Sequence, residues 1–180
     1  MPGQPSPRLD QLPSLNESGE VLAVIEASRG SRNKLKFDSA LGSFVLHGVL
    51  PSGLVYPYDF GFVPSTLADD GDPLDILVLT DEPAQVGVVV PCRLLGVLVA
   101  QQGQGRSKVR NDRLLAAAVH SQRYADARVL KDVTRDVLDD VQRFFIAHNE
   151  ARGQRFEPQG QYGAARAAKL LEEARRRYAG

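Results

Sequence analysis

The sequence has a single cysteine, no excess of either charge and no long apolar run, and each of these gaps excludes a class of protein. Cys92 alone cannot form a disulfide within the chain, and its apolar surroundings favour a small core residue over a nucleophile. Lys plus Arg and Asp plus Glu both number 22, so the composition implies no general attraction to nucleic acid. No run of about 18 apolar residues occurs, and residues 1–7 lack the basic and apolar plan of a signal segment. We therefore expect a cytoplasmic protein that neither enters a membrane nor binds nucleic acid.

The length of 180 residues favours one domain with a sizeable hydrophobic core. Prolines at positions 2, 5, 7 and 13 and little hydrophobic periodicity predict an extended or mobile segment over residues 1–19. Residues 20–180 then form the single domain, and no internal repeat divides it.

Short apolar or alternating runs separated by Gly and Pro predict strands through the first two thirds of the chain. Farther on, apolar residues at helical spacing predict one helix around 137–148 and another around 164–178. Residues 101–105, rich in Gln and Gly, are expected to form a mobile loop. The pattern favours an α+β fold, a small closed OB-like β-barrel of about five main strands flanked by two C-terminal helices. The expected strands lie at 21–27, 34–38, 44–46, 54–56, 76–79, 86–90, 94–100 and 114–119.

Three carboxylates occur within the six residues Asp70-Gly71-Asp72-Pro73-Leu74-Asp75, immediately before the apolar run 76–79. Gly can adopt a positive φ and Pro fixes its own φ, so the backbone between the acids is expected to be a defined turn. Carboxylates this close repel one another in a cleft unless a cation lies among them. Their oxygen atoms are the ligands that Mg²⁺ or Mn²⁺ prefers, which makes this turn a candidate metal site.

The acidic stretch has other interpretations besides a metal site. An acidic turn without a metal is the alternative, since Asp, Gly and Pro favour turns regardless of chemistry. A calcium helix-loop-helix site does not fit, because Leu74 stands where a ligand belongs and Asp75 where Gly belongs. An aspartyl phosphotransferase is disfavoured, because the apolar strand follows the acids instead of leading to them.

The acidic stretch resembles the signature of the soluble family I inorganic pyrophosphatases: Asp, a small residue, Asp, Pro, an aliphatic residue and Asp. Further segments resemble the same family from Val21 to the last helix. These segments are 24–26, 29–34, 55–62, 91–98, 131–133, 144–145 and 160–164.

The resemblance implies an inorganic diphosphatase, in which a metal-activated water splits pyrophosphate into two phosphates. It implies Mg²⁺ as cofactor, with Mn²⁺ as a substitute, and a homo-oligomer, which is common in the family. By the resemblance, Asp72 is the general base or orienting acceptor, and Tyr56 takes part in catalysis. The implied metal ligands are Asp70, Asp75 and Glu26, and the implied phosphate-binding residues are Lys34, Tyr56 and Arg113.

The sequence departs from the family pattern at several positions around the implied site. An acid is replaced by Lys36, and Arg113 stands in place of a Lys. Asp112 is adjacent to a lost metal-binding Asp, but a shift of one residue in a strand turns a side chain to the opposite face. The positions without the family residue are Lys36, Gly48, Phe60, Gln102, Asn111, His148 and Asn149.

Two hypotheses follow from these departures. In the first, Lys36, His148 and Arg113 restore lost positive charge from new directions; a phosphate complex with none of the three in the ligand shell would discard it. In the second, the protein is a catalytically weakened or inactive relative that binds metal or phosphate in a regulatory or scaffolding role. A nucleic-acid-binding barrel rests on fold analogy alone and is opposed by the zero net charge.

Overall fold

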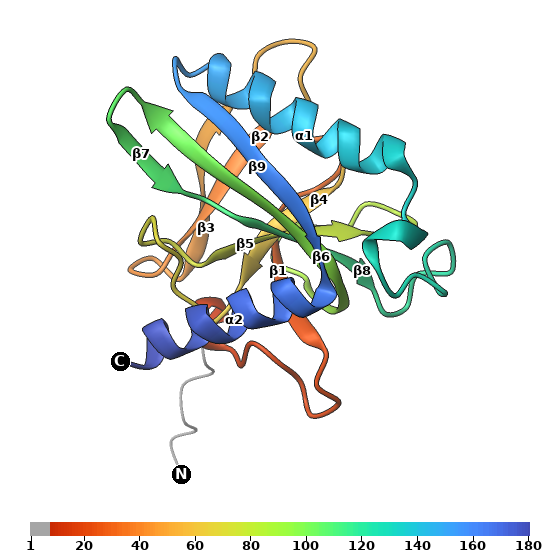
Figure 1. Ribbon diagram of the computed structural model, residues 1–180. Coiled ribbons are helices and arrows are strands. Elements are labelled where there is room, and N and C mark those ends of the chain that lie inside the picture. Colours follow the sequence, from red (N-terminus) through yellow and green to blue (C-terminus); the bar gives the residue numbers. More distant parts are fainter. Residues whose placement is uncertain (1–7) are drawn as a thin grey trace.

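The computed structural model describes residues 8–180, as nine strands, two α-helices and two short 3₁₀-helices (Figure 1). The strands are β1 (Val21–Ala27), β2 (Asn33–Asp38), β3 (Ser43–Val49), β4 (Asp59–Val63), β5 (Leu74–Leu79), β6 (Val89–Gln104), β7 (Ser107–Arg110), β8 (Arg113–Ala118) and β9 (Arg155–Gly163). The helices are η1 (Leu9–Gln11), η2 (Leu130–Asp132), α1 (Arg135–Glu150) and α2 (Ala164–Ala179).

Five strands form a closed ring, which confirms the predicted small barrel. The order is β1-β4-β5-β8-β6, and a further pairing of β1 with β6 closes the ring. All pairs in the ring are antiparallel except β5 with β8. Register shifts at 25–27 in β1 and 94–96 in β6 interrupt two of the ladders, as bulges do where a sheet must curve. The hairpin of β2 and β3 forms a separate two-stranded sheet beside the ring.

The strand after the acidic turn, β5, has both of its faces buried, which explains its unbroken apolar sequence. Leu74, Ile76 and Val78 pack in one hydrophobic cluster with buried residues of α2. Leu77 and Leu79 pack in the other cluster, with buried residues of α1. Figure 1 shows the two helices on opposite sides of the barrel. Because side chains alternate along a strand, Asp75 faces the same side as Leu77, toward α1.

Both predicted helices are confirmed, and α1 contributes a row of aromatic rings to the core. Phe144 lies against Tyr56, with ring centroids 5.0 Å apart, and Phe145 lies against Phe60 at 5.9 Å. His148 stacks on Phe144 at 5.7 Å and is 8% exposed, so it is packed at the end of this row of rings. Burial, together with the positive charges of nearby Lys and Arg side chains, lowers the pKa of His148 to about 4.

The sequence misplaces several strands. Residues 54–56 form no strand; the strand β4 begins at Asp59, after the Tyr-Pro segment. The expected strands at 86–90 and 94–100 are largely one strand, β6, of 16 residues. It continues through most of the predicted 101–105 loop, because β7 and β9 supply hydrogen-bonding partners there. Local polarity cannot reveal the pairing with β9, which is distant in the sequence, and it also hides the adjacent hairpin with β7.

Part of the predicted extended or mobile segment 1–19 can be compared with the structure. Residues 1–7 of it lie outside the described residues. Beyond them, η1 and a β-bridge between Leu15 and Val21 attach the segment to the barrel. The hydroxyl of Ser65 also donates a hydrogen bond of 2.8 Å to the carbonyl oxygen of Leu12. This part of the segment therefore lies on the surface of the barrel.

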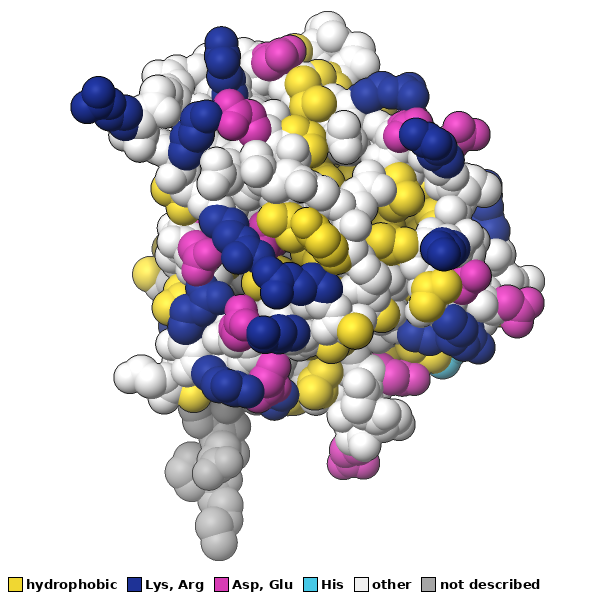
Figure 2. Space-filling view, in the orientation of Figure 1, with side chains coloured by type: hydrophobic (Ala, Val, Ile, Leu, Met, Phe, Trp, Pro, Cys, Tyr) yellow, Lys and Arg dark blue, Asp and Glu magenta, His cyan; other side chains and the backbone are white. Residues whose placement is uncertain are grey.

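The surface mixes both signs of charge. On the face shown in Figure 2, Lys and Arg side chains alternate with Asp and Glu, and apolar side chains lie between them. Within residues 8–180, neither helix combines the length and the apolar character that crossing a membrane requires.

Close packing of β1 against β4 gives a first prediction. A Cβ atom added at Gly61 would lie 1.9 Å from the carbonyl oxygen of Val24, whereas one added at Gly48 meets nothing within 4 Å. We expect Gly61→Ala to lower the free energy of unfolding by roughly 3 kcal/mol or more, because the ladder must shift. Gly48→Ala is the matched control, with a change of about 0.5 kcal/mol or less. Urea unfolding measures both, and equal stability of the two variants would contradict the packing.

The buried His148 gives a second prediction. Its ordinary pKa is about 6.5, so between that value and its folded pKa of about 4 the unfolded chain binds more protons. Acid therefore lowers the free energy of unfolding across this window. In the wild type, His148 makes the free energy of unfolding fall by about 3 kcal/mol between pH 7 and pH 4. We expect this fall to be absent in His148→Phe, which keeps a ring against Phe144.

The measurement is the difference between wild type and variant in chemical unfolding at several pH values, because carboxylates titrate in the same range. His120→Gln removes an exposed histidine and serves as the control, which keeps the wild-type acid sensitivity. If the free energy of unfolding of the wild type and of His148→Phe changes with pH in the same way, the lowered pKa of His148 is refuted.

Candidate active site

A cavity of about 560 Å³ opens where the acidic turn, the β2–β3 hairpin, β8 and the end of α1 meet. Strands from the ring and a helix that covers it each contribute side chains, so residues distant in the sequence converge here. The cavity is lined by all the residues to which the sequence assigns a role: Glu26, Lys34, Tyr56, Asp70, Asp72, Asp75 and Arg113.

The acidic stretch forms the defined turn that its sequence predicts. Gly71 has φ of 87°, a conformation that residues with a side chain rarely adopt. The backbone N–H of Asp72 donates to Oδ1 of Asp70 at 3.2 Å, and the N–H of Leu74 donates to the Thr66 hydroxyl at 2.9 Å. These bonds hold the three carboxylates at the mouth of β5, on one side of the cavity.

Glu26 and Asp75 are the carboxylates most affected by their surroundings. Burial raises the pKa of Glu26 to about 7, and the negative charge of Asp75 adds to the rise. Burial likewise raises the pKa of Asp75 to about 6, against the opposing effect of Arg113. The backbone N–H of Phe37 donates to Oε1 of Glu26 at 3.0 Å, which ties this carboxylate to β2. Both groups are therefore placed where added positive charge would stabilise their ionised forms.

Two cationic side chains already lie beside the acids. Nζ of Lys36 is 2.7 Å from Oδ1 of Asp72, and Nη2 of Arg113 is 3.7 Å from Oδ2 of Asp75. The Lys36–Asp72 pair is about half exposed, while Arg113 is almost wholly buried. Internal cations therefore neutralise part of the charge of the acidic cluster.

Arg113 is held in one orientation by contacts on every side. Its guanidinium carbon lies 4.0 Å from the ring centroid of Phe145 and 4.9 Å from that of Phe156. Nη1 donates to the carbonyl oxygen of Asn111 at 2.7 Å, and Nη2 donates to Oε1 of Gln102 at 3.3 Å. Nε is buried and has no hydrogen-bond partner among the described residues. The group is thus a fixed positive charge in the cavity wall, with its Nε–H unpaired within residues 8–180.

Lys34 and Tyr56 complete the polar lining of the cavity. Burial and the positive charge of Arg152 lower the pKa of Lys34. Burial raises the pKa of the Tyr56 hydroxyl, so the hydroxyl stays protonated and can donate a hydrogen bond. Both side chains can therefore meet an anion in the cavity, one as an ammonium group and one as a neutral donor.

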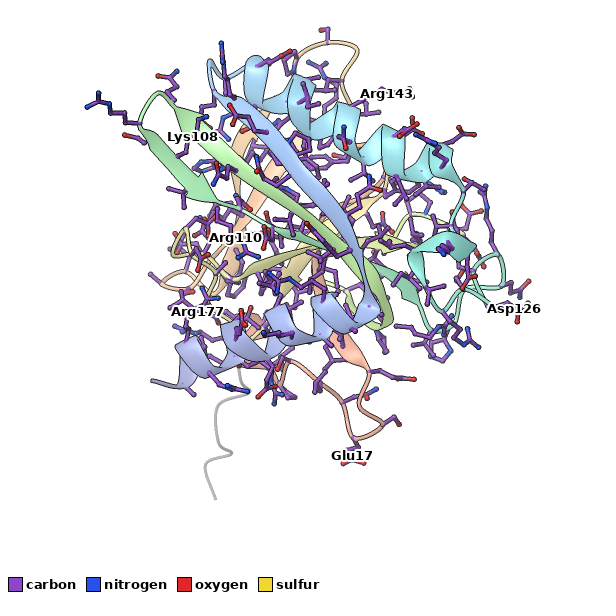
Figure 3. All side chains as sticks on the ribbon, viewed as in Figure 1. Glu17, Lys108, Arg110, Asp126, Arg143 and Arg177 are labelled. Carbon is purple, nitrogen blue, oxygen red and sulfur yellow. The ribbon has the colours of Figure 1, made fainter. Side chains whose placement is uncertain are left out.

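The other positions that depart from the family pattern are placed by the structure as follows. His148 lines the cavity, but its lowered pKa makes it neutral at pH 7, so without a ligand it adds no positive charge. Nδ2 of Asn149 donates to the carbonyl oxygen of Phe145 at 2.8 Å, within the helix. Asp112 accepts from Arg110, labelled in Figure 3, and from the N–H of Ala100, and it does not line the cavity. The expected reversal of its side chain is confirmed.

Among the residues that line the cavity, His47 and Arg152 carry nitrogen donors that the sequence does not reveal. His47 lines the cavity and Gly48, the position considered from the sequence, does not. The ladder between β2 and β3 shifts register between Lys34 and Leu35, which moves the inward-facing position by one residue. Arg152 also lines the cavity, from the turn after α1, and no local pattern in the sequence marks it.

The oxygen-rich donor set fits a hard divalent cation in kind. Glu26, Asp70 and Asp75 line one cavity, and burial, with a smaller effect of neighbouring negative charges, raises the pKa of each. In the arrangement of residues 8–180, however, no three His, Cys, Asp or Glu side chains converge tightly enough to hold a metal ion together. Small movements of these side chains would therefore have to accompany binding.

Comparisons with known proteins agree with this arrangement. The model of the family described as inorganic pyrophosphatase matches residues 23–179. An inorganic pyrophosphatase from Nostoc sp. is 41% identical over 140 residues, which cover 78% of this chain and 80% of that protein.

Solved structures give the same result. The inorganic pyrophosphatase of Thermus thermophilus superposes with a TM-score of 0.88 at 35% identity, covering 97% of this chain and all of the other (100%). That of Helicobacter pylori superposes with a TM-score of 0.85 at 31% identity, over 94% of this chain and 99% of the other. The protein therefore belongs to the inorganic pyrophosphatase family.

Proposed function

We propose that this protein is an inorganic diphosphatase that hydrolyses pyrophosphate to two phosphates with the help of divalent metal ions. The observation that carries the proposal is the meeting of Glu26, Asp70, Asp72 and Asp75 in one cavity with the cations of Lys34 and Arg113. Pyrophosphate is a compact polyanion, so it needs positive charge around its oxygens and a base for the attacking water. Family membership supports the same reaction.

The carboxylates divide between two roles in this proposal. Asp70, Asp75 and Glu26 hold Mg²⁺, for which Mn²⁺ can substitute. Bound Mg²⁺ would neutralise phosphate charge and lower the pKa of a water molecule. The Asp72 side chain is 51% exposed, against 22% for Asp75, and it accepts a proton from the attacking water at its carboxylate.

The remaining polar residues bind the substrate. Lys34 and Arg113 contact the phosphate oxygens from two sides of the cavity, Arg113 as a preoriented planar donor group. The Tyr56 hydroxyl donates a hydrogen bond to an oxygen that gains charge during the reaction. The tilted rings of Phe60 and Phe145, 5.9 Å apart, form the apolar part of the cavity lining beside them.

The proposal also includes the cellular setting that the family resemblance implies. We place the protein in the cytoplasm, where it assembles with copies of itself.

The metal requirement is the first prediction of this proposal. We expect release of phosphate from pyrophosphate with Mg²⁺ or Mn²⁺, and loss of the activity when EDTA removes the metal, because the metal offsets the phosphate charge that Lys34 and Arg113 leave and lowers the pKa of the attacking water. A phosphate-release assay with restoration by added Mg²⁺ measures this. A folded protein that turns over pyrophosphate with neither metal would contradict the proposal and favour the catalytically inactive relative.

The second prediction concerns Asp75. We expect Asp75→Asn to lower kcat by about a hundredfold or more, because it removes a charged oxygen ligand while keeping the shape of the side chain. Asp69→Asn is the matched control: Asp69 belongs to the same turn region, pairs with Arg177 on the surface and does not line the cavity. We expect the control to keep wild-type kcat, and similar losses in both variants would exclude a specific role of Asp75.

A further inference from the structure

Lys36 places a positive charge beside Asp72, the carboxylate that accepts the proton of the attacking water in the proposed reaction. Its Nζ is 2.7 Å from Oδ1 of Asp72, and both side chains are about half exposed, at 47% and 51%. The pair therefore lies at the open side of the cavity, where solutes reach it. An ion pair so exposed contributes about 0–1 kcal/mol to folding, so stability alone does not account for its position.

The position of Lys36 is fixed by the strand that carries it. β2 is tied to Glu26 by the hydrogen bond from the N–H of Phe37, the residue after Lys36. β2 also pairs along its whole length with β3. The backbone of Lys36 is therefore held against one carboxylate of the cavity while its side chain reaches another.

Arg113 forms a similar ion pair with Asp75: its Nη2 is 3.7 Å from Oδ2 of Asp75. Of the four carboxylates in the cavity assigned to the reaction, two thus have a cation of the protein as partner. The ion pairs formed by the described residues include none to Glu26 or Asp70. The acidic cluster is therefore unevenly neutralised: Asp72 and Asp75 have a resident positive charge, and Glu26 and Asp70 do not.

We propose that Lys36 acts as a resident cation that replaces a divalent ion at Asp72, so that the cavity binds fewer metal ions than its carboxylates would otherwise attract. Lys36 is then a positioning residue, which holds the Asp72 carboxylate toward the open side of the cavity. This inference rests on the proposed function for its meaning in catalysis. The effect of Lys36 on metal affinity can be measured without any reaction.

The physical basis is competition between two cations for the same oxygens. An ammonium group at hydrogen-bond distance occupies one carboxylate oxygen and repels a nearby divalent ion. In a cavity open to solvent, one unit charge about 5 Å from a divalent ion changes its affinity by about tenfold. Arg113 cannot be tested in the same way, because its side chain is buried against Phe145 and Phe156 and its removal would leave a cavity in the protein interior.

The test is binding of Mn²⁺ to the full-length protein in the absence of pyrophosphate, followed by the electron paramagnetic resonance signal of the free ion. We expect Lys36→Met to bind Mn²⁺ about tenfold more tightly than the wild type, and Lys36→Glu about a hundredfold more tightly, with one additional ion bound. Lys108→Met is the matched control. Lys108 projects from β7 (Figure 3) and forms an ion pair of 2.8 Å with Glu157, away from the cavity.

We expect the control to bind Mn²⁺ as the wild type does. Equal Mn²⁺ affinity in the wild type, Lys36→Met and Lys36→Glu would overturn the proposal, as would a lack of binding in all three. Lys36→Gln provides a second neutral variant if Lys36→Glu fails to fold, and circular dichroism verifies the fold of each. An inactive protein in which the Lys36 variants still gain affinity would refute the proposed reaction and leave the role of Lys36 standing.

Discussion

The mutual repulsion of carboxylates at the mouth of β5 is the constraint on which the whole site depends. Asp70, Asp72 and Asp75 are brought together by a six-residue turn, and Glu26 approaches them from β1. Burial raises the pKa of Glu26 and of Asp75, so these groups are strained in their ionised forms. Positive charge must reach the cluster from somewhere. The protein supplies part of it through Lys36 and Arg113, and a divalent cation supplies the rest in the proposed reaction.

The barrel stabilises this crowded arrangement because it holds the acids on a rigid frame. β5 is packed on both faces, against α1 on one side and α2 on the other, so the end of the strand cannot move away from the other carboxylates. The same packing fixes Arg113, whose guanidinium lies over the two neighbouring rings of Phe145 and Phe156. A charge that is immobilised in this way needs little reorganisation when an anion enters. Fold and site are thus connected through one strand.

The sequence predicted the parts of the structure that local patterns control. The acidic turn, the apolar strand after it and the two amphipathic helices all depend on neighbours within a few residues. The closed barrel followed from the spacing of short strands. The sequence failed where strand pairing decides: the length of β6 depends on the adjacent β7 and on the distant β9, and the cavity position of His47 depends on a register shift between β2 and β3. The contact of Lys36 with Asp72 joins residues 36 positions apart and follows from no local pattern.

The central claim is that the acids beside β5 gather divalent ions. The most direct measurement is an anomalous difference map from crystals soaked in Mn²⁺. Our account predicts a peak bounded by the carboxylates of Asp70 and Asp75, on the Glu26 side of the cavity. A map without a peak in this cavity, or one with these carboxylates turned outward into bulk solvent, would contradict it.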